Sequence, residues 1–145
     1  MYVVVDCNRV IAAFLKDGTT RQILFDREHL FVAPEFLKEE VNKYKSMILV
    51  KAHISTNDFD TLQELFFERM SFIKQTLIES YMDKARNCVS DEKDTAYVAC
   101  CFASKAEGVW THDPHFSKNK EFKIITNIGL LKKDTMNDSK RKPRN

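Results

Sequence analysis

The chain has 145 residues, which fits one domain because chains usually divide only beyond about 250 residues. Its 43% hydrophobic and 30% charged residues exclude a disordered chain, and its apolar runs are too short for a membrane span or a signal peptide. The formal net charge of +2 is unevenly placed, since residues 132–145 alone carry +4 and the remainder carries −2.

Two residue types narrow the class of protein further. Three Gly and three Pro provide little material for a series of tight hairpins, which counts against an all-β sandwich. The four Cys form neither a CxxC pair nor a zinc-binding spacing. We therefore expect reduced thiols in a cytoplasmic protein, without a disulfide scaffold and without a membrane partner.

The first third of the chain alternates predicted strands and helices. Residues 2–5 are apolar and β-branched, as in a parallel strand buried on both faces. Apolar residues then recur at helical spacing up to Gly18, which is expected to stop the helix. A short helix through Leu24 follows, and residues 30–33 form a second predicted strand. Pro34 suits the first turn of the next helix.

The rest of the chain continues this alternation. Ser55 and Asp58 resemble a capping box at the start of a helix, whose apolar stripe is Phe59, Leu62, Phe66 and Met70. The remaining elements, in chain order, are a strand at 72–73, a helix through 77–85, a helix at 91–105, and strands at 108–111 and 123–126. Strands that alternate with helices predict an α/β fold with a mainly parallel sheet.

Two acidic residues follow predicted strands directly. Asp6 comes after the first strand, and Asp113 lies two residues beyond Thr111 at the end of a late strand. Ligand sites of open α/β sheets lie outside the carboxyl ends of the strands. The sequence therefore predicts that both carboxylates face such a site.

Helical phase places further acids on buried faces. At 100° per residue, Glu40 falls on the face that Leu37 defines, whereas Glu39 faces water. In the later helix Asp94 lies in the middle of the apolar stripe, with Asp91 close to it. Burying an unpaired carboxylate is prohibitive, and neither stripe contains an Arg or Lys. A metal ion is then the economical partner.

Each acid also has a purely structural interpretation. Asp6 suits the cap of the following helix, and Glu40 suits a position at the edge of its stripe that reaches solvent. Asp91 and Asp94 suit the cap and the third residue of a helix, and for Asp91 this is the better interpretation. Asp113 suits an ordinary turn. The acids converge on one end of the sheet, however, and this convergence favours a site.

Four motifs in this order resemble those of a known family: VVVDCNRVIAAF, PEFLKEEV, DEKDTAYVACCFA and GVWTHDPHF. From Tyr2 to Thr126 the chain is similar to the PIN-domain nucleases. The resemblance implies a three-layer α/β/α sandwich around a parallel sheet of about five strands. It also implies an endoribonuclease that uses Mg²⁺ or Mn²⁺, commonly the toxin of a toxin–antitoxin pair.

The resemblance also assigns the site residues. The catalytic and metal-binding set that it implies is Asp6, Glu40, Asp94 and Asp113, with Asp91 as a further candidate ligand and Asn8 and Thr111 as supporting polar residues. Elementary chemistry agrees, because clustered carboxylates repel one another and hard divalent cations relieve that repulsion. Asp6 and Asp113 are expected as main ligands, Asp94 as a ligand or water holder, and Glu40 as a ligand or base. His112 and His115 are expected at the surface.

Several roles stay open at this point. The alternatives to a toxin are an RNA-processing PIN nuclease outside toxin–antitoxin systems, and a PIN-like module that binds RNA or protein without cutting. A haloacid-dehalogenase-type phosphatase needs Asp-x-Asp, where this chain has Asp6, Cys7 and Asn8, and a receiver domain needs a Lys after its fifth strand. The expected partners are RNA, an antitoxin protein and a second copy of the chain, because the stripe around Phe66 is more apolar than one buried face requires.

The C-terminal residues differ from the rest in composition. Six Lys or Arg and two Asp lie within 132–145. We expect residues 1–131 to form the nuclease domain and 132–145 to form a basic, flexible tail. Such a tail is either a solvated end or a contact for a polyanion.

Overall fold

A computed structural model describes residues 1–113 and 121–131 of the chain. Its centre is a five-stranded sheet in the order β3-β2-β1-β4-β5, and every pairing is parallel. The strands are β1 (Tyr2–Val5), β2 (Leu30–Pro34), β3 (Met70–Ile73), β4 (Gly108–Trp110) and β5 (Lys123–Ile125). The parallel five-stranded sheet expected from the sequence is confirmed.

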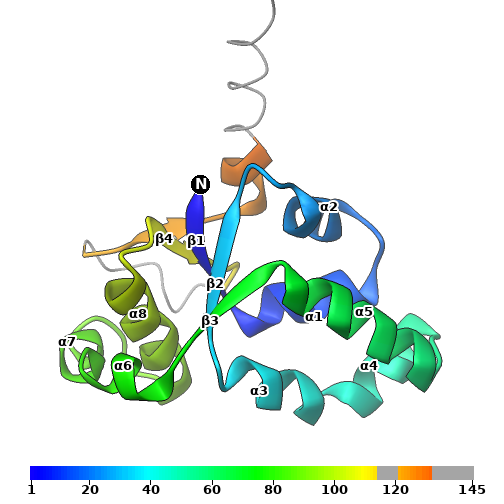
Figure 1. The fold of residues 1–145 in the computed structure, drawn as a ribbon, viewed down its shortest axis with the longest axis horizontal. Coiled ribbons are helices and arrows are strands. Elements are labelled where there is room, and N and C mark those ends of the chain that lie inside the picture. The colour runs from blue at the N-terminus through cyan, green and yellow to red at the C-terminus, as the bar shows by residue number, and fades with distance from the viewer. Residues whose placement is uncertain (114–120, 132–145) are drawn as a thin grey trace, which may run out of the picture.

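Helices cover both faces of the sheet, which gives three layers (Figure 1). One layer holds α6 (Gln75–Glu79), α7 (Met82–Arg86) and α8 (Glu92–Ser104), and α8 contacts β1, β2 and β4. The opposite layer holds α1 (Cys7–Leu15), α2 (Thr19–Phe25), α3 (Leu37–Lys43), α4 (Lys45–Ala52) and α5 (Thr56–Glu68). Residues 127–131 are helical as well. Among the described residues, no helix is long and apolar enough to cross a membrane.

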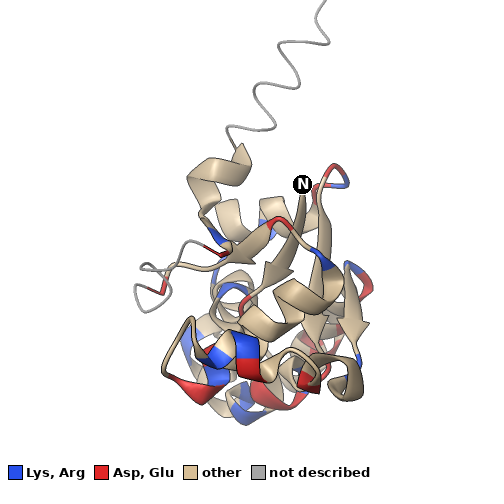
Figure 2. Cartoon of the chain, turned by 90° about the vertical axis from the view of Figure 1, so that its left-hand side faces the viewer, with Lys and Arg blue, Asp and Glu red and all other residues tan. Residues whose placement is uncertain are grey.

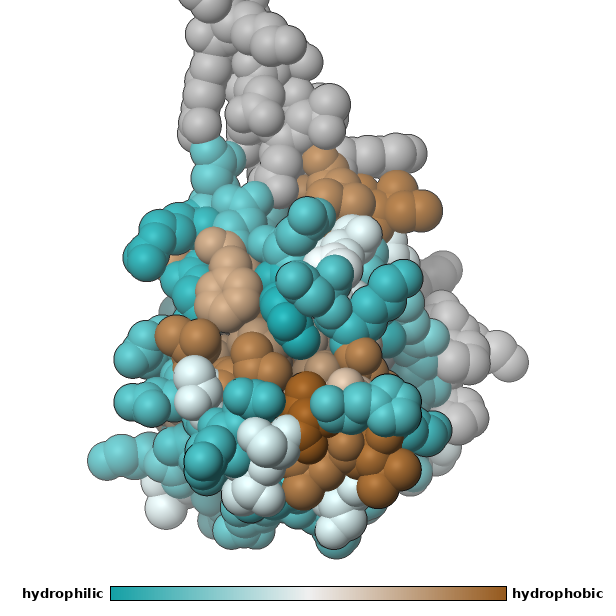
Figure 3. Space-filling view, turned by 90° about the vertical axis from the view of Figure 1, so that its right-hand side faces the viewer, coloured by the Kyte–Doolittle hydropathy of each residue, from teal (hydrophilic) through white to brown (hydrophobic). Residues whose placement is uncertain are grey.

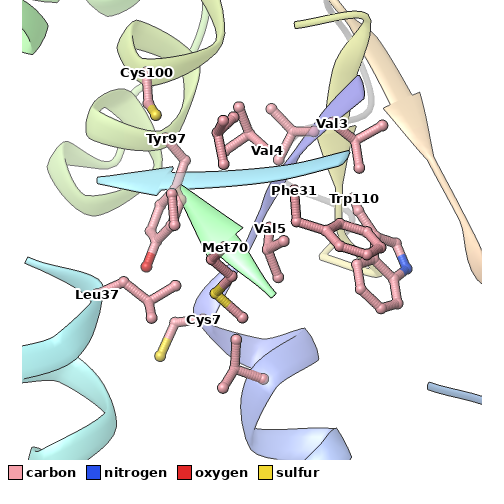
Figure 4. Close-up of a cluster of buried hydrophobic side chains, with 14 of the residues drawn as sticks. Val3, Val4, Val5, Cys7, Phe31, Leu37, Met70, Tyr97, Cys100 and Trp110 are labelled. Atoms are coloured by element: carbon pink, nitrogen blue, oxygen red, sulfur yellow. The ribbon is translucent and has the colours of Figure 1, made fainter. Parts of the chain in front are cut away.

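The core lies between the sheet and these two layers. The side chains of Val3–Val5 are fully buried, as expected for a central parallel strand, and they form part of the apolar cluster in Figure 4. Beneath the sheet, the Phe14 ring stacks on Phe59 with centroids 4.7 Å apart and meets the edge of Phe66 at 4.8 Å. Burial of each Phe stabilises the fold by about 2 kcal/mol. Phe59 and Phe66 of the α5 stripe therefore serve this chain's own core.

Three details of the sequence-based elements are wrong. Pro34 ends β2 instead of starting a helix; it lies beyond the segment that pairs with β1, so its missing N–H leaves that pairing intact. The segment 77–85 is divided between α6 and α7, because Tyr81 leaves helical geometry at φ −113° and ψ 2°.

Met70 is the third correction, since it begins β3 and does not extend α5. Arg69 ends the helix, and its guanidinium donates hydrogen bonds of 2.9, 2.9 and 3.3 Å to the carbonyls of Leu24, Asp26 and His29. These bonds tie the end of α5 to the end of α2 and to the loop before β2. The helix therefore ends at Arg69, and the chain enters the sheet with β3.

Gly108 holds β4 close to β5. A Cβ at this position would lie 2.3 Å from the carbonyl oxygen of Lys123, its partner in the pairing of the two strands. Only glycine permits this approach. The β4–β5 pairing in turn fixes the end of β4, where Thr111 and Asp113 follow.

Candidate active site

The order of the strands creates a switch point between β1 and β4. From β1 the chain moves outward through β2 and β3, and it later returns to the other side of β1 with β4 and β5. Ligands of open parallel sheets bind in the crevice at such a point. Asp6 follows β1 there, and its backbone N–H donates a 3.1 Å bond to the carbonyl of Trp110 at the end of β4. Asp6 and the loop after β4 therefore lie side by side.

Asp6 and Thr111 form a buried hydrogen-bonded pair. The Thr111 hydroxyl donates to Asp6 Oδ2 at 2.7 Å, and its oxygen accepts the backbone N–H of Asp113 at 3.0 Å. Asp6 occupies the N-cap position of α1, but its side chain makes no capping hydrogen bond. The side chain of Asp6 is thus held toward the crevice by Thr111 and is not used as a helix cap.

The surroundings of Asp6 disfavour its charge. Burial raises the pKa of Asp6 above its usual value, against the lowering by the Thr111 hydroxyl and the nearby backbone amide of Asn8. The negative charges of Asp113 and Glu40 raise the pKa further. A carboxylate that is buried beside other carboxylates has a marked preference for a cation.

Glu40 enters the same region from α3. Its Oε1 accepts a 2.8 Å hydrogen bond from the hydroxyl of Tyr97, which comes from α8 on the other face of the sheet. Glu40 is half-buried and Glu39 is exposed, as the helical phase of α3 predicts. Its half-buried side chain thus faces Tyr97 and remains partly accessible to solvent at the edge of the stripe.

The first turn of α8 contributes two more acids. Asp91 is the N-cap, and its Oδ1 accepts the backbone N–H groups of Lys93 and Asp94 at 2.9 and 3.4 Å. This is the capping role that the sequence favours for Asp91. Asp94 is only 9% exposed although its side chain is a carboxyl group, as expected from its place in the apolar stripe.

One cavity of about 260 Å³ brings these acids together. Its lining residues, from the loops after β1 and β4 and from α3 and α8, are Asp6, Cys7, Asn8, Glu40, Tyr44, Asp91, Lys93, Asp94, Tyr97 and Asp113. Figure 2 shows Asp and Glu positions at the lower end of the molecule, toward which β1 runs from the N-terminus. Each acid expected from the sequence thus lines the cavity, and Thr111 lies behind Asp6.

Sequence reasoning missed several residues of this cavity. Lys93 gives no sequence signal for this cavity, because it is exposed at the first turn of α8 and lies off the buried stripe. Tyr97 gives no sequence signal beyond its place among the apolar residues of this helix, although a tyrosine carries a donor that must be satisfied when buried. Cys7 follows Asp6 in the chain, and burial raises the pKa of its thiol, so it stays protonated at neutral pH.

His112 is exposed, as expected, and it has a structural contact. Its Nε2 accepts the backbone N–H of Asn127 at 3.3 Å. Burial, and then the charge of Arg9, lower the pKa of His112, which favours the neutral ring. His115 lies outside the described residues.

The donors of the cavity fit a hard divalent cation in their chemistry. They are carboxylate oxygens, the ligands that Mg²⁺ and Mn²⁺ prefer. Among the described residues, no three acidic, imidazole or thiol side chains converge tightly enough to form a ready-made metal site.

Comparison with known proteins identifies the family. No curated protein and no solved structure gives a significant match to the chain. A family model described as PIN domain matches residues 4–136, which is most of the chain. PIN domains are generally nucleases, and the family typically uses divalent metal ions. With its parallel α/β/α sandwich and with acids at the expected edge of the sheet, the chain belongs to the PIN-domain family.

Proposed function

We propose that this protein is a Mg²⁺- or Mn²⁺-dependent endoribonuclease that hydrolyses phosphodiester bonds of RNA. The observation that carries the proposal is the single cavity lined by five carboxylates from four separate segments. Two of these carboxylates are buried and two are half-buried, and such a concentration of negative charge is unfavourable unless a cation offsets it. Its place at the switch point of a parallel sheet supports a catalytic role.

We assign different roles to the acidic residues of the cavity. Asp6, held by Thr111, and Asp113 on the adjacent loop would be the main ligands of the metal ion. Asp94 would bind the ion or hold a water molecule, and Glu40 would act as a ligand or as the base. When bound, the ion supplies charge neutralisation and an acidified water for in-line attack on the phosphodiester. The expected products carry a 5′-phosphate and a 3′-hydroxyl.

The surroundings of the cavity suit a polyanionic strand. Lys93 adds a cation to the wall, and an exposed ammonium is well placed to meet a phosphate. A second hollow of about 330 Å³ adjoins the cavity, since Asp91 and Asp94 line both. An extended substrate would have room beyond the scissile bond.

Finer parts of the proposal rest on the family resemblance. We assign the protein a cytoplasmic role as the toxin of a toxin–antitoxin pair, with an antitoxin protein as partner. Growth arrest on expression, relieved by co-expression of a small neighbouring reading frame, would support this role. Active enzyme without growth arrest would support an RNA-processing role outside such systems. Bound RNA that stays intact would instead support a non-catalytic module.

We also propose a homodimer. Figure 3 shows apolar side chains among hydrophilic ones on the side of the molecule that carries α4 and α5. A hollow of about 490 Å³ on α2 and α5 is lined in part by Phe25, Leu62 and Leu65. The basic residues 132–145, for which we propose RNA contact, lie outside the described residues.

The chemistry of the cleaved ends tests the proposed function. Single-stranded RNA incubated with the protein and Mn²⁺ should give fragments with 5′-phosphate ends, detected by their sensitivity to a 5′-phosphate-dependent exonuclease. Asp6→Asn protein, purified in parallel, should give no fragments, which excludes a contaminating nuclease. Fragments that end in a 2′,3′-cyclic phosphate would indicate metal-free attack by the ribose hydroxyl and would contradict the proposal.

A further inference from the structure

Tyr97 connects two of the helices that form the cavity. It comes from α8, and its hydroxyl reaches Glu40 of α3 at 2.8 Å. Figure 4 shows the ring extending from α8 with its oxygen directed toward Leu37 and Cys7. The side chain is only 2% exposed, so the position of this hydroxyl is set by the protein and not by solvent.

An aromatic contact also holds the ring of Tyr97 in place. The ring meets the edge of Phe36, with centroids 5.2 Å apart and planes at 61°. Phe36 is the N-cap residue of α3, the helix that carries Glu40. The same side chain thus contacts α3 through its ring and through its hydroxyl.

Tyr97 is the donor in this hydrogen bond. A phenol carries an O–H group and a carboxylate oxygen accepts, so Oε1 of Glu40 is the acceptor. Within the described residues, Oε1 is the only oxygen of Glu40 that accepts a hydrogen bond from a side chain, so Oε2 remains for another ligand.

We infer that Tyr97 is a positioning residue for the metal site: its hydroxyl holds one oxygen of Glu40 and thereby presents the other oxygen to the cation. The inference rests on the proposed metal-dependent function. Groups that orient a metal ligand in this way change metal affinity by about 10- to 100-fold when they are removed. The competing interpretation is that Glu40 merely satisfies a buried tyrosine.

The test measures Mn²⁺ affinity of the full chain from the electron paramagnetic resonance signal of free Mn²⁺. Tyr97→Phe keeps the ring and removes the hydroxyl, and we expect Mn²⁺ binding to weaken about 10-fold. Tyr2→Phe is the matched control. Tyr2 is the first residue of β1, at the end of the strand opposite to Asp6, so the variant should leave the Mn²⁺ affinity unchanged. In cleavage assays Tyr97→Phe should lower kcat about 10-fold and leave KM for RNA unchanged.

A second pair of variants tells the two interpretations apart. If Tyr97 acts through Glu40, then adding Tyr97→Phe to Glu40→Gln should weaken Mn²⁺ binding no further. Equal Mn²⁺ affinity in Tyr97→Phe and wild-type protein would overturn the inference, as would an additive loss in the double variant. Wild-type protein that binds Mn²⁺ but cleaves no RNA would overturn the proposed function alone, since the Mn²⁺ comparison still decides the role of Tyr97.

Discussion

Replacement of Asp6 by Asn should stabilise the metal-free protein while it abolishes cleavage. Burial raises the pKa of Asp6, and the charges of Asp113 and Glu40 add to this effect. The folded state therefore resists ionisation of Asp6 more than the unfolded state does. Asn keeps the size of the side chain and an oxygen that can accept the 2.7 Å bond from Thr111.

The effect of pH follows from the direction of this shift. Below the unfolded pKa of about 3.9, both states hold the proton on Asp6 and the carboxyl causes no loss of stability. As the pH rises above that value, the folded state retains the proton longer, and stability is lost until the pH exceeds the raised pKa. The advantage of Asp6→Asn should thus be present at pH 7 and vanish toward pH 4.

The net effect combines a gain with a loss. Removal of the charge relieves the burial penalty and the repulsion from Asp113 and Glu40, whereas a neutral hydrogen bond from Thr111 is about 1 kcal/mol weaker than one to a carboxylate. We expect the gain to exceed the loss at pH 7, so that the melting temperature of Asp6→Asn lies above that of the wild type. Cleavage should fall by at least about 100-fold.

Thermal unfolding by circular dichroism in EDTA at pH 4 and pH 7 measures this effect. Asp17→Asn is the matched control: the side chain is 82% exposed and its ion pair with Arg21 is 3.9 Å long, so its melting temperature should follow that of the wild type. A lower melting temperature for Asp6→Asn at pH 7, or the same gain at both pH values, would refute the electrostatic reasoning.

Three further predictions concern other parts of the molecule. Glu40→Gln should lower cleavage by about 100-fold or more, whereas Glu39→Gln on the exposed face should keep near-normal rates and alter stability by less than about 0.5 kcal/mol; the reverse pattern would contradict the phase of α3. Leu65→Glu should convert the proposed dimer to a monomer in light scattering, and a wild-type monomer at tens of micromolar would remove the basis for the dimer. Deletion of residues 132–145, which carry a net charge of +4, should reduce the salt slope of RNA binding by about 3, since each of about four phosphate contacts on a single strand contributes about 0.7; an unchanged slope would mean that the tail makes no contact.

The fold was predictable because its elements carry strong local patterns. A buried parallel strand such as β1 is a run of β-branched residues, and its aspartate at the end marks the edge of the sheet. Helical phase separated Glu40 from Glu39, because one helical step of 100° turns a side chain from the interior to solvent. Where tertiary contacts end an element, as Arg69 does for α5, the local pattern contains no signal.

The acidic residues that line the cavity could be predicted from the sequence, whereas its other residues could not. Carboxylates at strand ends or on buried faces are unusual, so Asp6 and Asp94 stand out in the sequence. Tyr97 looks like any aromatic residue of a buried stripe, and its bond to Glu40 joins residues 57 positions apart. Lys93 looks like an ordinary surface lysine until the fold brings α8 beside the loop after β1.

The dependence of cleavage on a divalent cation tests the central claim most directly. Protein dialysed against EDTA and returned to metal-free buffer should cleave single-stranded RNA at a background rate, and addition of Mg²⁺ or Mn²⁺ should restore cleavage by at least about 100-fold in wild-type protein and not in Asp6→Asn protein. Equal cleavage in the presence of excess EDTA, or equal restoration in Asp6→Asn, would contradict the account of a carboxylate-held metal site.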